Sequence, residues 1–402
     1  PACPTYELWG EEMDSPRGRI YLMREGLEGE PLTDSMVGHF DACLGCMACV
    51  TACPSGVRYD TLITETRAQV ERNHVRGRWD RLWRNAIFAL FPYPRRLRFM
   101  RAPLALYQRL RLGSLLRRIG LWRKLPARLR TMEELVPPIE SMPELGRRIP
   151  ARGTRRAVVG MVTGCVQGVF FPDVNAATAR VLAAEGCEVV IPPSQGCCGA
   201  LSEHSGREPE AIAFARRLLD SFAQSEVDYI VINSAGCGST LKDYPRLLRD
   251  DPQYAELAER FAARVRDIAE LLTELGPVAT RHPLPMSVAY HDACHLSHGQ
   301  GVRSQPRELL RAIPELELRE VPRGELCCGS AGVYNLLQPE PAAELGDRKA
   351  DNVLKTEASM LVTSNPGCSM QIRSALERRD ASLPMAHTVQ VLDASIRGAS
   401  LP

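Results

Sequence analysis

Several features that would point to a familiar activity are missing from this 402-residue sequence. It has no run of about 18 apolar residues, which argues against a membrane-spanning helix. It also lacks a glycine-rich G-x-G-x-x-G fingerprint, so a dinucleotide cofactor is not expected on this chain. No Ser/His/Asp grouping or paired-carboxylate motif stands out, and a net charge of +2 does not make the whole molecule a polyanion binder. What is abundant is cysteine, with 14 residues.

The first cysteines form a metal-binding pattern. Cys43, Cys46 and Cys49 are separated by two residues each, and Cys53 follows with Pro54 directly after it. In bacterial ferredoxins this spacing lets three thiolates bind one [4Fe–4S] cluster, while the fourth ligates a second cluster. Zinc is the alternative for an isolated C-x-x-C pair, but the full run with its proline favours iron and sulfur.

The start of the sequence extends this pattern, because Cys3 and Pro4 resemble the end of an earlier ferredoxin run. The crossing-over of ligands in two-cluster domains predicts that Cys3 completes the cluster of the C-x-x-C-x-x-C run. Cys53 would then serve another cluster, whose remaining ligands would precede residue 1. We therefore expect the sequence to be incomplete at its N-terminus. No secretory signal is visible, so the cysteine pairs favour metal in a reducing compartment over disulfides.

Residues 73–155 are expected to form a basic helical linker between domains. Between residues 72 and 130 there are seventeen Arg or Lys and one acidic residue, Asp80. Aromatic residues are interleaved with this charge, a pattern that fits anionic lipid headgroups, an acidic protein surface or nucleic acid. No nucleic-acid motif accompanies it, so nucleic acid is not an expected partner. We favour a membrane-surface or partner-docking face, with a solvated linker wrapped on its own protein as the alternative.

Prolines are expected to divide this linker. Pro92, Pro94, Pro103 and Pro126 should break its helices into short pieces, because proline removes a backbone hydrogen bond and clashes with the preceding turn. The proline-rich stretch 131–155 is expected to be an interdomain linker.

From about residue 156 the chain repeats itself. Each copy has an apolar strand ending in a cysteine, then Cys-Cys-Gly, then a second apolar strand ending in a cysteine. The intervals are 32 and 39 residues in the first copy and 33 and 40 in the second. The cysteines are Cys165, Cys197, Cys198 and Cys237 in the first copy, and Cys294, Cys327, Cys328 and Cys368 in the second. The repeat predicts two related domains, at 156–280 and 281–402.

Helical periodicity separates the short strands of these repeats, at 173–185, 208–223, 303–312 and 339–356. Alternating strands and helices imply parallel β-α units, whose functional loops gather at the carboxyl ends of the strands. Each repeat should therefore bring four sulfurs to one edge of a sheet. The expected fold class is α plus α/β: a small α-helical ferredoxin-like domain over 1–72, then two repeated Rossmann-like α/β cysteine-rich domains packed as a pseudo-twofold pair.

Adjacent cysteines favour a cluster over a single ion, because the short backbone between them cannot easily spread two sulfurs around one tetrahedral zinc. Gly199 and Gly329 would let the backbone approach the cluster and donate N–H groups to its sulfides. One iron–sulfur cluster per repeat is predicted; structural zinc and a redox-active thiol site with a vicinal disulfide are the alternatives. Cys187 lies outside the repeat and is expected to be a core thiol. Four nearby histidines could be ligands or proton relays, although a capping or surface role is favoured for each: His204, His291, His295 and His298.

Together these residues resemble the iron–sulfur subunit of glycolate oxidase, within the larger group of proteins with paired cysteine-rich "CCG" domains. The resemblance covers essentially the whole chain. The group includes subunits of lactate-utilisation enzymes, anaerobic glycerol-3-phosphate dehydrogenase and heterodisulfide reductase. The motifs that carry it are CPTY from Cys3, DSPRGRIY from Asp14, CPSGV from Cys53, QGCCGAL from Gln195 and YHDACH from Tyr290.

The resemblance implies an electron relay that is not catalytic alone. Flavin-containing catalytic subunits of the same complex would oxidise glycolate or another 2-hydroxy acid, and this chain would pass the electrons to a membrane quinone. It would be a cytoplasmic protein, peripherally associated with the inner membrane through the basic segment 73–130. A lactate or glycerol-3-phosphate dehydrogenase subunit, cluster-based thiol–disulfide chemistry as in heterodisulfide reductase, and a zinc-stapled scaffold are the alternatives.

The sequence departs from the best-understood CCG domains in one respect. Those domains end in a C-x-x-C pair, whereas Ser234 and Asn365 occupy the earlier position of that pair here. Four cysteines per repeat remain, which suffice for an ordinary cluster, so an unusual non-cubane cluster is not carried over.

Overall fold

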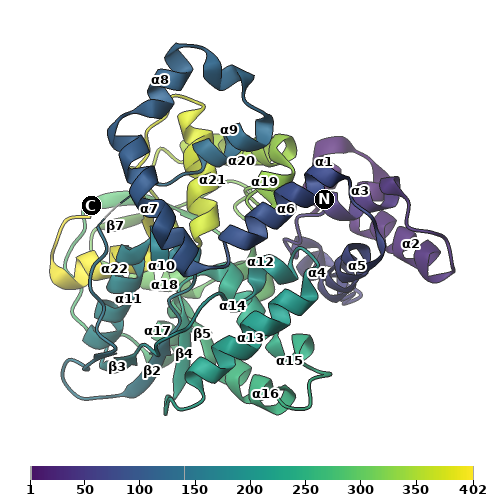
Figure 1. Ribbon diagram of the computed structural model, residues 1–402. Helices are drawn as coiled ribbons and strands as arrows, with labels where there is room; N and C mark the ends of the chain where they lie inside the picture. Colours follow the sequence, from purple (N-terminus) through teal and green to yellow (C-terminus); the bar gives the residue numbers. More distant parts are fainter. Residues whose placement is uncertain (1, 140, 402) are drawn as a thin grey trace.

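The computed structural model describes residues 2–139 and 141–401, which form three parts (Figure 1). The N-terminal part is entirely helical, as predicted. Thr33 caps its third helix, because the Thr33 hydroxyl accepts a hydrogen bond from the Met36 N–H. Its elements are α1 (Pro4–Trp9), η1 (Glu12–Asp14), α2 (Pro16–Leu27), α3 (Asp34–Ala42), α4 (Ala48–Ala52) and α5 (Tyr59–Asn73).

The linker is helical, and its elements are α6 (Arg78–Leu90), α7 (Pro94–Arg109), α8 (Leu112–Arg118), η2 (Leu121–Lys124) and α9 (Ala127–Glu134). The expectation that Pro103 ends a helix is wrong, because Pro103 lies inside α7. Proline at this position frees only the carbonyl of Phe99, whose residue is 80% exposed, so water can replace the lost bond. None of the helices described for residues 2–139 and 141–401 is both long and apolar enough to cross a membrane.

The stretch 131–155 also contains a strand that was not predicted. This strand, β1 (Arg148–Ile149), pairs antiparallel with β3 of the first repeat. The linker therefore ends by adding an edge strand to the first sheet.

The first repeat is a five-stranded sheet in the order β1-β3-β2-β4-β5, parallel except for β1. Its strands are β2 (Ala157–Met161), β3 (Cys187–Val190), β4 (Tyr229–Ile232) and β5 (Val265–Asp267). Its helices are α10 (Val166–Phe170), α11 (Pro172–Ala184), α12 (Ala200–Glu203), α13 (Glu208–Phe222), α14 (Ala235–Lys242), α15 (Tyr244–Leu247), α16 (Ala255–Arg264) and α17 (Ile268–Leu275).

The second repeat is a parallel sheet in the order β7-β6-β8-β9, which matches β3-β2-β4-β5 strand for strand. Its strands are β6 (Met286–His291), β7 (Leu316–Glu320), β8 (Met360–Thr363) and β9 (Met385–His387). Its helical elements are the π turn η3 (His295–Gly299), α18 (Gln305–Arg311), α19 (Tyr334–Leu337), α20 (Pro339–Leu354), α21 (Pro366–Glu377) and α22 (Thr388–Arg397). The predicted mixture of a helical part with parallel α/β sheets is confirmed.

The repeats pack against each other through equivalent helices. Helix α11 of the first repeat packs on α22 of the second, and α17 packs on α18, so the two contacts exchange under a pseudo-twofold axis. One apolar core runs through this interface and includes Leu182, Leu271, Leu310 and Leu392, all essentially inaccessible to water. Burying each leucine contributes about 2 kcal/mol, so the pair is held as one body.

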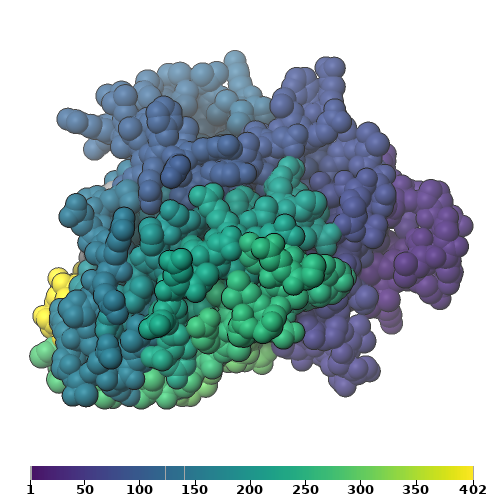
Figure 2. Space-filling view, turned by 60° about the horizontal axis from the view of Figure 1, so that its bottom comes forward, coloured from purple at the N-terminus to yellow at the C-terminus, as the bar shows by residue number. Residues whose placement is uncertain are grey.

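The N-terminal part and the linker pack on this pair at separate places. Leu44 and Ala48 join an apolar cluster with Cys327 of the second repeat. Phe88 of α6 packs on Leu336, while Leu97 of α7 packs on the first repeat. Figure 2 shows the N-terminal part (purple) at one end of the molecule and the first repeat (teal to green) on the face in view. The first half of the linker is thus wrapped on its own protein.

Candidate iron–sulfur sites

The helical N-terminal part surrounds one small cavity with four thiols. Cys43, Cys46, Cys49 and Cys3 all line it, and they are the four cysteines that ligand crossing-over assigns to one cluster. Cys53 does not line this cavity, and the backbone N–H groups of the residues that follow it lower its pKa. The arrangement fits a [4Fe–4S] cluster held by the first four, with the sulfur of Cys53 directed elsewhere; the assignment of ligands remains a prediction.

Positive charge lies beside this cavity. Burial favours the neutral thiol of Cys43, yet the guanidinium groups of Arg19 and Arg67 lower its pKa below the ordinary value. The Cys43 sulfur also accepts hydrogen bonds from the Gly45 N–H, at 3.3 Å, and the Tyr59 hydroxyl, at 3.7 Å. Arg19 is fully buried and binds the Asp14 carboxylate. Sequence reasoning missed these arginines, which would offset the negative charge that thiolates and a cluster bring into the interior.

The first repeat gathers its four cysteines at the carboxyl edge of its sheet. Cys165 Sγ lies 3.6 Å from Cys197 Sγ, and the thiols of Cys198 and Cys237 interact in turn. Gly199 adopts a left-handed φ of +89°, and its N–H points to Cys197 Sγ at 3.3 Å. The left-handed turn at Gly199 lets a backbone donor face the Cys197 sulfur, and its predicted donation to cluster sulfides stays a prediction.

The second repeat repeats this geometry with different surroundings. Cys294 Sγ lies 3.9 Å from Cys327 Sγ, and Cys328 and Cys368 interact in the same way as their counterparts. Gly329 has a φ of +88°. Lys349 of α20 is buried behind the Cys-Cys pair, where burial lowers its pKa, and its ammonium donates to the carbonyl of Gly324. Lys349 was not among the predicted site residues, because a single lysine in an amphipathic helix gives no such signal.

The donor set fits iron–sulfur chemistry. All eight repeat cysteines but Cys237 are buried, none forms a disulfide, and they lie in two groups of four. In the first repeat, the neighbouring thiols and burial raise the pKa values of Cys197, Cys198 and Cys237, so the group of thiols needs a metal to ionise together. Cys187, in contrast, lies in the core of the first sheet, and burial raises its pKa to about 11.

The N-terminal site and the second repeat site are neighbours. Cys46 and Cys294 belong to one apolar cluster, and burial together with the Cys294 thiol raises the pKa of Cys46 well above its usual value. Arg67 joins this junction to the first repeat, because it donates to the carbonyls of both Cys43 and His204. The three cysteine sites therefore converge on one region of the molecule.

The four histidines separate into three groups. His204 and His295 stack with ring centroids 4.7 Å apart at the junction. His298 is partly exposed, and its ring contacts the Thr51 hydroxyl at 2.7 Å across the domain boundary. His291 is 1% exposed and lies among the cysteines of the second repeat. The sequence could not separate these roles, because all four lie within a few residues of a cysteine.

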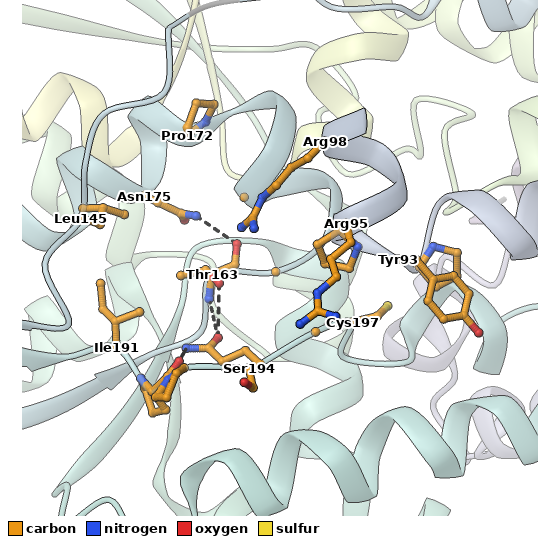
Figure 3. Close-up of a pocket in the computed structure, with 18 of the residues that line it drawn as sticks. Tyr93, Arg95, Arg98, Leu145, Thr163, Pro172, Asn175, Ile191, Ser194 and Cys197 are labelled. Carbon is orange, nitrogen blue, oxygen red and sulfur yellow. Dashed lines mark hydrogen bonds between the residues drawn. The ribbon is translucent and has the colours of Figure 1, made fainter. Parts of the chain in front are cut away.

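A cavity of about 660 Å³ opens beside the first repeat site (Figure 3). Cys197 and Thr163 line its floor, Tyr93 and Phe214 belong to its wall, and Arg95 of α7 points into it. Five arginines and no acidic residue are among its described lining residues; the arginines are Arg95, Arg96, Arg98, Arg147 and Arg217. The size is that of a small-molecule site.

The matching place in the second repeat is a groove that the N-terminal part borders on one side. Asp292 and Glu325 correspond there to Thr163 and Gln195, and they line this groove together with Thr51 and Ala52 of the N-terminal part. The cysteine edge of the second repeat therefore faces the N-terminal part, whereas the cysteine edge of the first repeat faces a cavity.

The fold and its sites define an iron–sulfur protein with a ferredoxin-type domain and paired cysteine-rich domains. Family models match in the same order: a 4Fe-4S dicluster domain at residues 1–57, the linker region of the glycolate oxidase iron–sulfur subunit at 79–136, and the cysteine-rich domain at 159–242 and again at 288–373. The chain belongs to the glycolate oxidase iron–sulfur subunit family.

Relatives support this membership over most of the chain. The probable glycolate oxidase iron–sulfur subunit of Bacillus subtilis is 37% identical over 95% of this chain and 88% of its own length. The glycolate oxidase iron–sulfur subunit of Escherichia coli is 35% identical over 93% of this chain and 87% of its own length. Lactate utilization protein A of Exiguobacterium is 28% identical over 60% of this chain and 99% of its own length. The chain is thus an iron–sulfur component of an oxidoreductase complex.

Proposed function

We propose that this chain relays electrons from the flavin of a partner subunit, which oxidises glycolate or a related 2-hydroxy acid, to a membrane quinone. The single observation that carries the proposal is the contact between the N-terminal site and the second repeat site. Cys46 and Cys294 lie in one apolar cluster, so centres held by these residues would be neighbours with no water between them. A relay needs such adjacency, and a set of structural zinc sites does not.

The cavity beside Cys197 is our proposed acceptor site. It has apolar walls that suit a quinone ring and arginines that suit the oxygen atoms of its reduced forms. Helix α7 connects it to the proposed membrane face, because α7 begins at the cavity with Arg95 and runs to the exposed Leu106 and Arg109. A lipid-soluble carrier would thus have a path from the bilayer to the first repeat.

The proposed membrane face is formed by residues 99–121 of α7 and α8, which protrude from the body at the top of Figure 1. Its exposed apolar residues are Phe99, Leu106, Leu110, Leu115, Ile119 and Leu121. Arginines alternate with them in the sequence, as in helices that lie in the headgroup layer of anionic membranes. By contrast, Arg84 of α6 and Arg128 of α9 are paired internally: Arg84 binds Asp80 and Asp41, and Arg128 binds Asp80. We therefore place peripheral association in α7 and α8 and not in the whole basic segment.

The relay is tested by purifying the complex without oxygen and adding substrate. With the flavoprotein partner present, glycolate should reduce iron–sulfur signals of this chain, and lactate should be compared at equal concentration. The Cys46→Ser variant should lose one signal and block transfer, while the Cys187→Ser variant, which changes a core thiol outside the sites, should not. If substrate still reduces the repeat centres in full when the N-terminal cluster is absent, the proposed relay is wrong.

The acceptor site and the membrane face have separate tests. An Arg95→Glu/Arg98→Glu variant should raise the KM for a short-chain quinone at least tenfold and leave cluster reduction by the flavoprotein unchanged. A Phe99→Ser/Leu106→Ser/Leu110→Ser variant should lose flotation with anionic vesicles. Arg260→Glu on α16, in the first repeat, is the charge-change control for both measurements. Unchanged flotation of the triple variant would show that the proposed membrane face does not bind membranes.

One observation favours a second candidate, thiol–disulfide chemistry at the second repeat. The neighbouring thiol of Cys327 holds the pKa values of Cys294 and Cys328 well below their usual range, as reactive thiolates require. Both residues are buried, however, and the N-terminal part borders their edge of the sheet. Reduction of a heterodisulfide by the isolated chain, with no flavoprotein binding, would favour this candidate over the relay.

A further inference from the structure

We propose that His291 is a ligand of iron in the second repeat, so that this centre has mixed thiolate and imidazole coordination while the first repeat centre has thiolates alone. The proposal rests on the iron–sulfur sites of the proposed function. It does not depend on the substrate or on the direction of electron flow.

The geometry brings His291 into the group of ligand atoms. A ring nitrogen of His291 and the sulfurs of Cys328 and Cys368 all lie within 4.8 Å of one another. Around one tetrahedral ion, nitrogen and sulfur donors stand about 3.5–3.8 Å apart, so the three side chains need only a small contraction to bind it. Among the described residues of the chain this is the one group of three such side chains so closely spaced.

Among the described residues, the ring of His291 faces the sulfur atoms of Cys328 and Cys368, and it interacts with the Cys328 thiol. The residue is 1% exposed, and neither Nδ1 nor Nε2 makes a hydrogen bond of normal geometry to any residue the structure describes. A buried polar group without a partner is costly, by about 1–3 kcal/mol, and is rare in native proteins. A metal ion within reach of the ring resolves this, because imidazole nitrogen is a common ligand of iron in proteins.

The first repeat supplies an internal comparison. His291 precedes Cys294 by three residues, and the residue that precedes Cys165 by three is Val162. Val162 is fully buried and packs in the apolar cluster that contains Cys165, Cys197 and Cys198. Both repeats therefore bury this position against their cysteines, but only the second can donate an electron pair from it.

The difference has a direct redox consequence. The second repeat keeps four cysteines, so His291 changes the charge of the centre where its imidazole takes the iron position of one of these thiolates. Neutral imidazole in place of a thiolate removes one negative charge and raises the reduction potential, as in Rieske clusters. The second repeat centre should therefore be easier to reduce than the first. This ordering would hold electrons beside the N-terminal site, which the second repeat contacts.

The test uses the full chain, loaded with iron and reduced by dithionite, so that it does not require the flavoprotein. Pulsed EPR is recorded on unsubstituted protein grown with ordinary histidine and with ¹⁵N-labelled histidine. We expect a histidine nitrogen coupling that changes with the label. It should disappear in His291→Ala and persist in His295→Ala and His298→Ala, which remove the two neighbouring rings. In His291→Cys the centre should be retained with a lower reduction potential.

Three results would overturn the proposal. The first is an iron centre in the unsubstituted protein whose spectrum does not respond to the histidine label, a result that needs no variant to fold. The second is a labelled coupling that survives in His291→Ala and vanishes in His295→Ala. The third is zinc, in place of iron, in the second repeat. Failure of glycolate to reduce the complex would bear on the proposed function only.

Discussion

The two cysteine-rich repeats share a strand order and a cysteine register, yet their surroundings differ at almost every contact. The first repeat buries Val162 beside its thiols and opens onto a cavity rich in arginine; the second buries His291 and Lys349 and faces the N-terminal part. Duplicated scaffolds fix where sulfur lies, while the residues around the sulfur decide what each centre exchanges electrons with. The predictions below test how far the two halves are equivalent.

The largest effect is expected from removing one of the paired cysteines in either repeat. Cys198→Ser and Cys328→Ser are matched variants, because both residues are the second cysteine of the pair and both are buried. Each should lose the iron and acid-labile sulfide of its own repeat and keep the rest, since the two groups of thiols lie in separate sheets. Iron analysis with EPR measures this. Loss of both repeat centres in one variant would show that the sites are not independent.

Next in size is the pH dependence of stability at His387, which caps α22. The Nδ1 atom of His387 accepts from the Val389 N–H, and Nε2 donates to the Asn233 carbonyl of the first repeat, so the neutral ring is required. Burial lowers the pKa of His387 to about 4, below the value near 6.5 of an unfolded chain. The contribution of His387 to the free energy of unfolding is complete above pH 6.5. It is lost as pH falls towards 4, by about 3 kcal/mol in total.

The first repeat has Asp267 at the equivalent cap, and its pH dependence should have the opposite sign. Burial raises the pKa of Asp267 to about 7, so the folded state favours its protonated form and loses that contribution as pH rises from about 4 to 7. His387→Asn and Asp267→Asn keep a capping side chain and remove the titration. Urea unfolding of each variant against the parent, from pH 4.5 to 7.5, should give differences of opposite slope; parallel slopes would contradict the assignment.

A smaller difference is expected between the two glycines that follow the Cys-Cys pairs. Both have left-handed φ values, but an added Cβ would lie 2.5 Å from the Ala342 carbonyl oxygen at Gly329 and 3.1 Å from the Ala211 oxygen at Gly199. Gly329→Ala should therefore lower the free energy of unfolding by about 2 kcal/mol and Gly199→Ala by about 1 kcal/mol. Chemical denaturation of both variants measures this. If Gly329→Ala costs no more stability than Gly199→Ala, then α20 moves to make room for the added methyl group and α13 does not.

The smallest effect concerns the contact between the N-terminal part and the second repeat. Glu7 of α1 binds Arg323, with 2.6 Å between Oε2 and Nη2, and Arg323 is half exposed. Glu7→Gln should weaken docking of the N-terminal part by less than about 1 kcal/mol. Hydrogen exchange of the α4 amides should quicken slightly, and Glu12→Gln, which breaks a pair inside the N-terminal part, is the control. A large effect would mean that this ion pair, and not the apolar cluster, holds the domains together.

Sequence periodicity was sufficient to locate the strands β2, β3, β4, β6 and β8, the helices α11, α13, α18 and α20, and the gathering of the repeat cysteines, because these depend on local pattern and on parallel topology. The strands β1, β5, β7 and β9 were not predicted. It could not place Cys46 beside Cys294, since contacts between distant segments leave no periodic trace. Lys349 and Arg67 were missed for the same reason. The path of the chain through Pro103 was mispredicted because exposure, which the sequence does not report, decides whether a helix tolerates proline there.

The short strand β1 also changes which backbone groups are left unpaired at the edge of the first sheet. An open sheet exposes unpaired backbone groups along its outer strand, and such strands invite pairing between molecules. In the first repeat the linker covers this strand, since β1 pairs with β3 and the Ile191 N–H donates to the Arg147 carbonyl. The counterpart β7 is an outermost strand, and it carries charge instead, at Glu317, Arg319 and Glu320. One outer strand is thus covered by chain, and the other carries charged side chains, which disfavour pairing with a strand of another molecule.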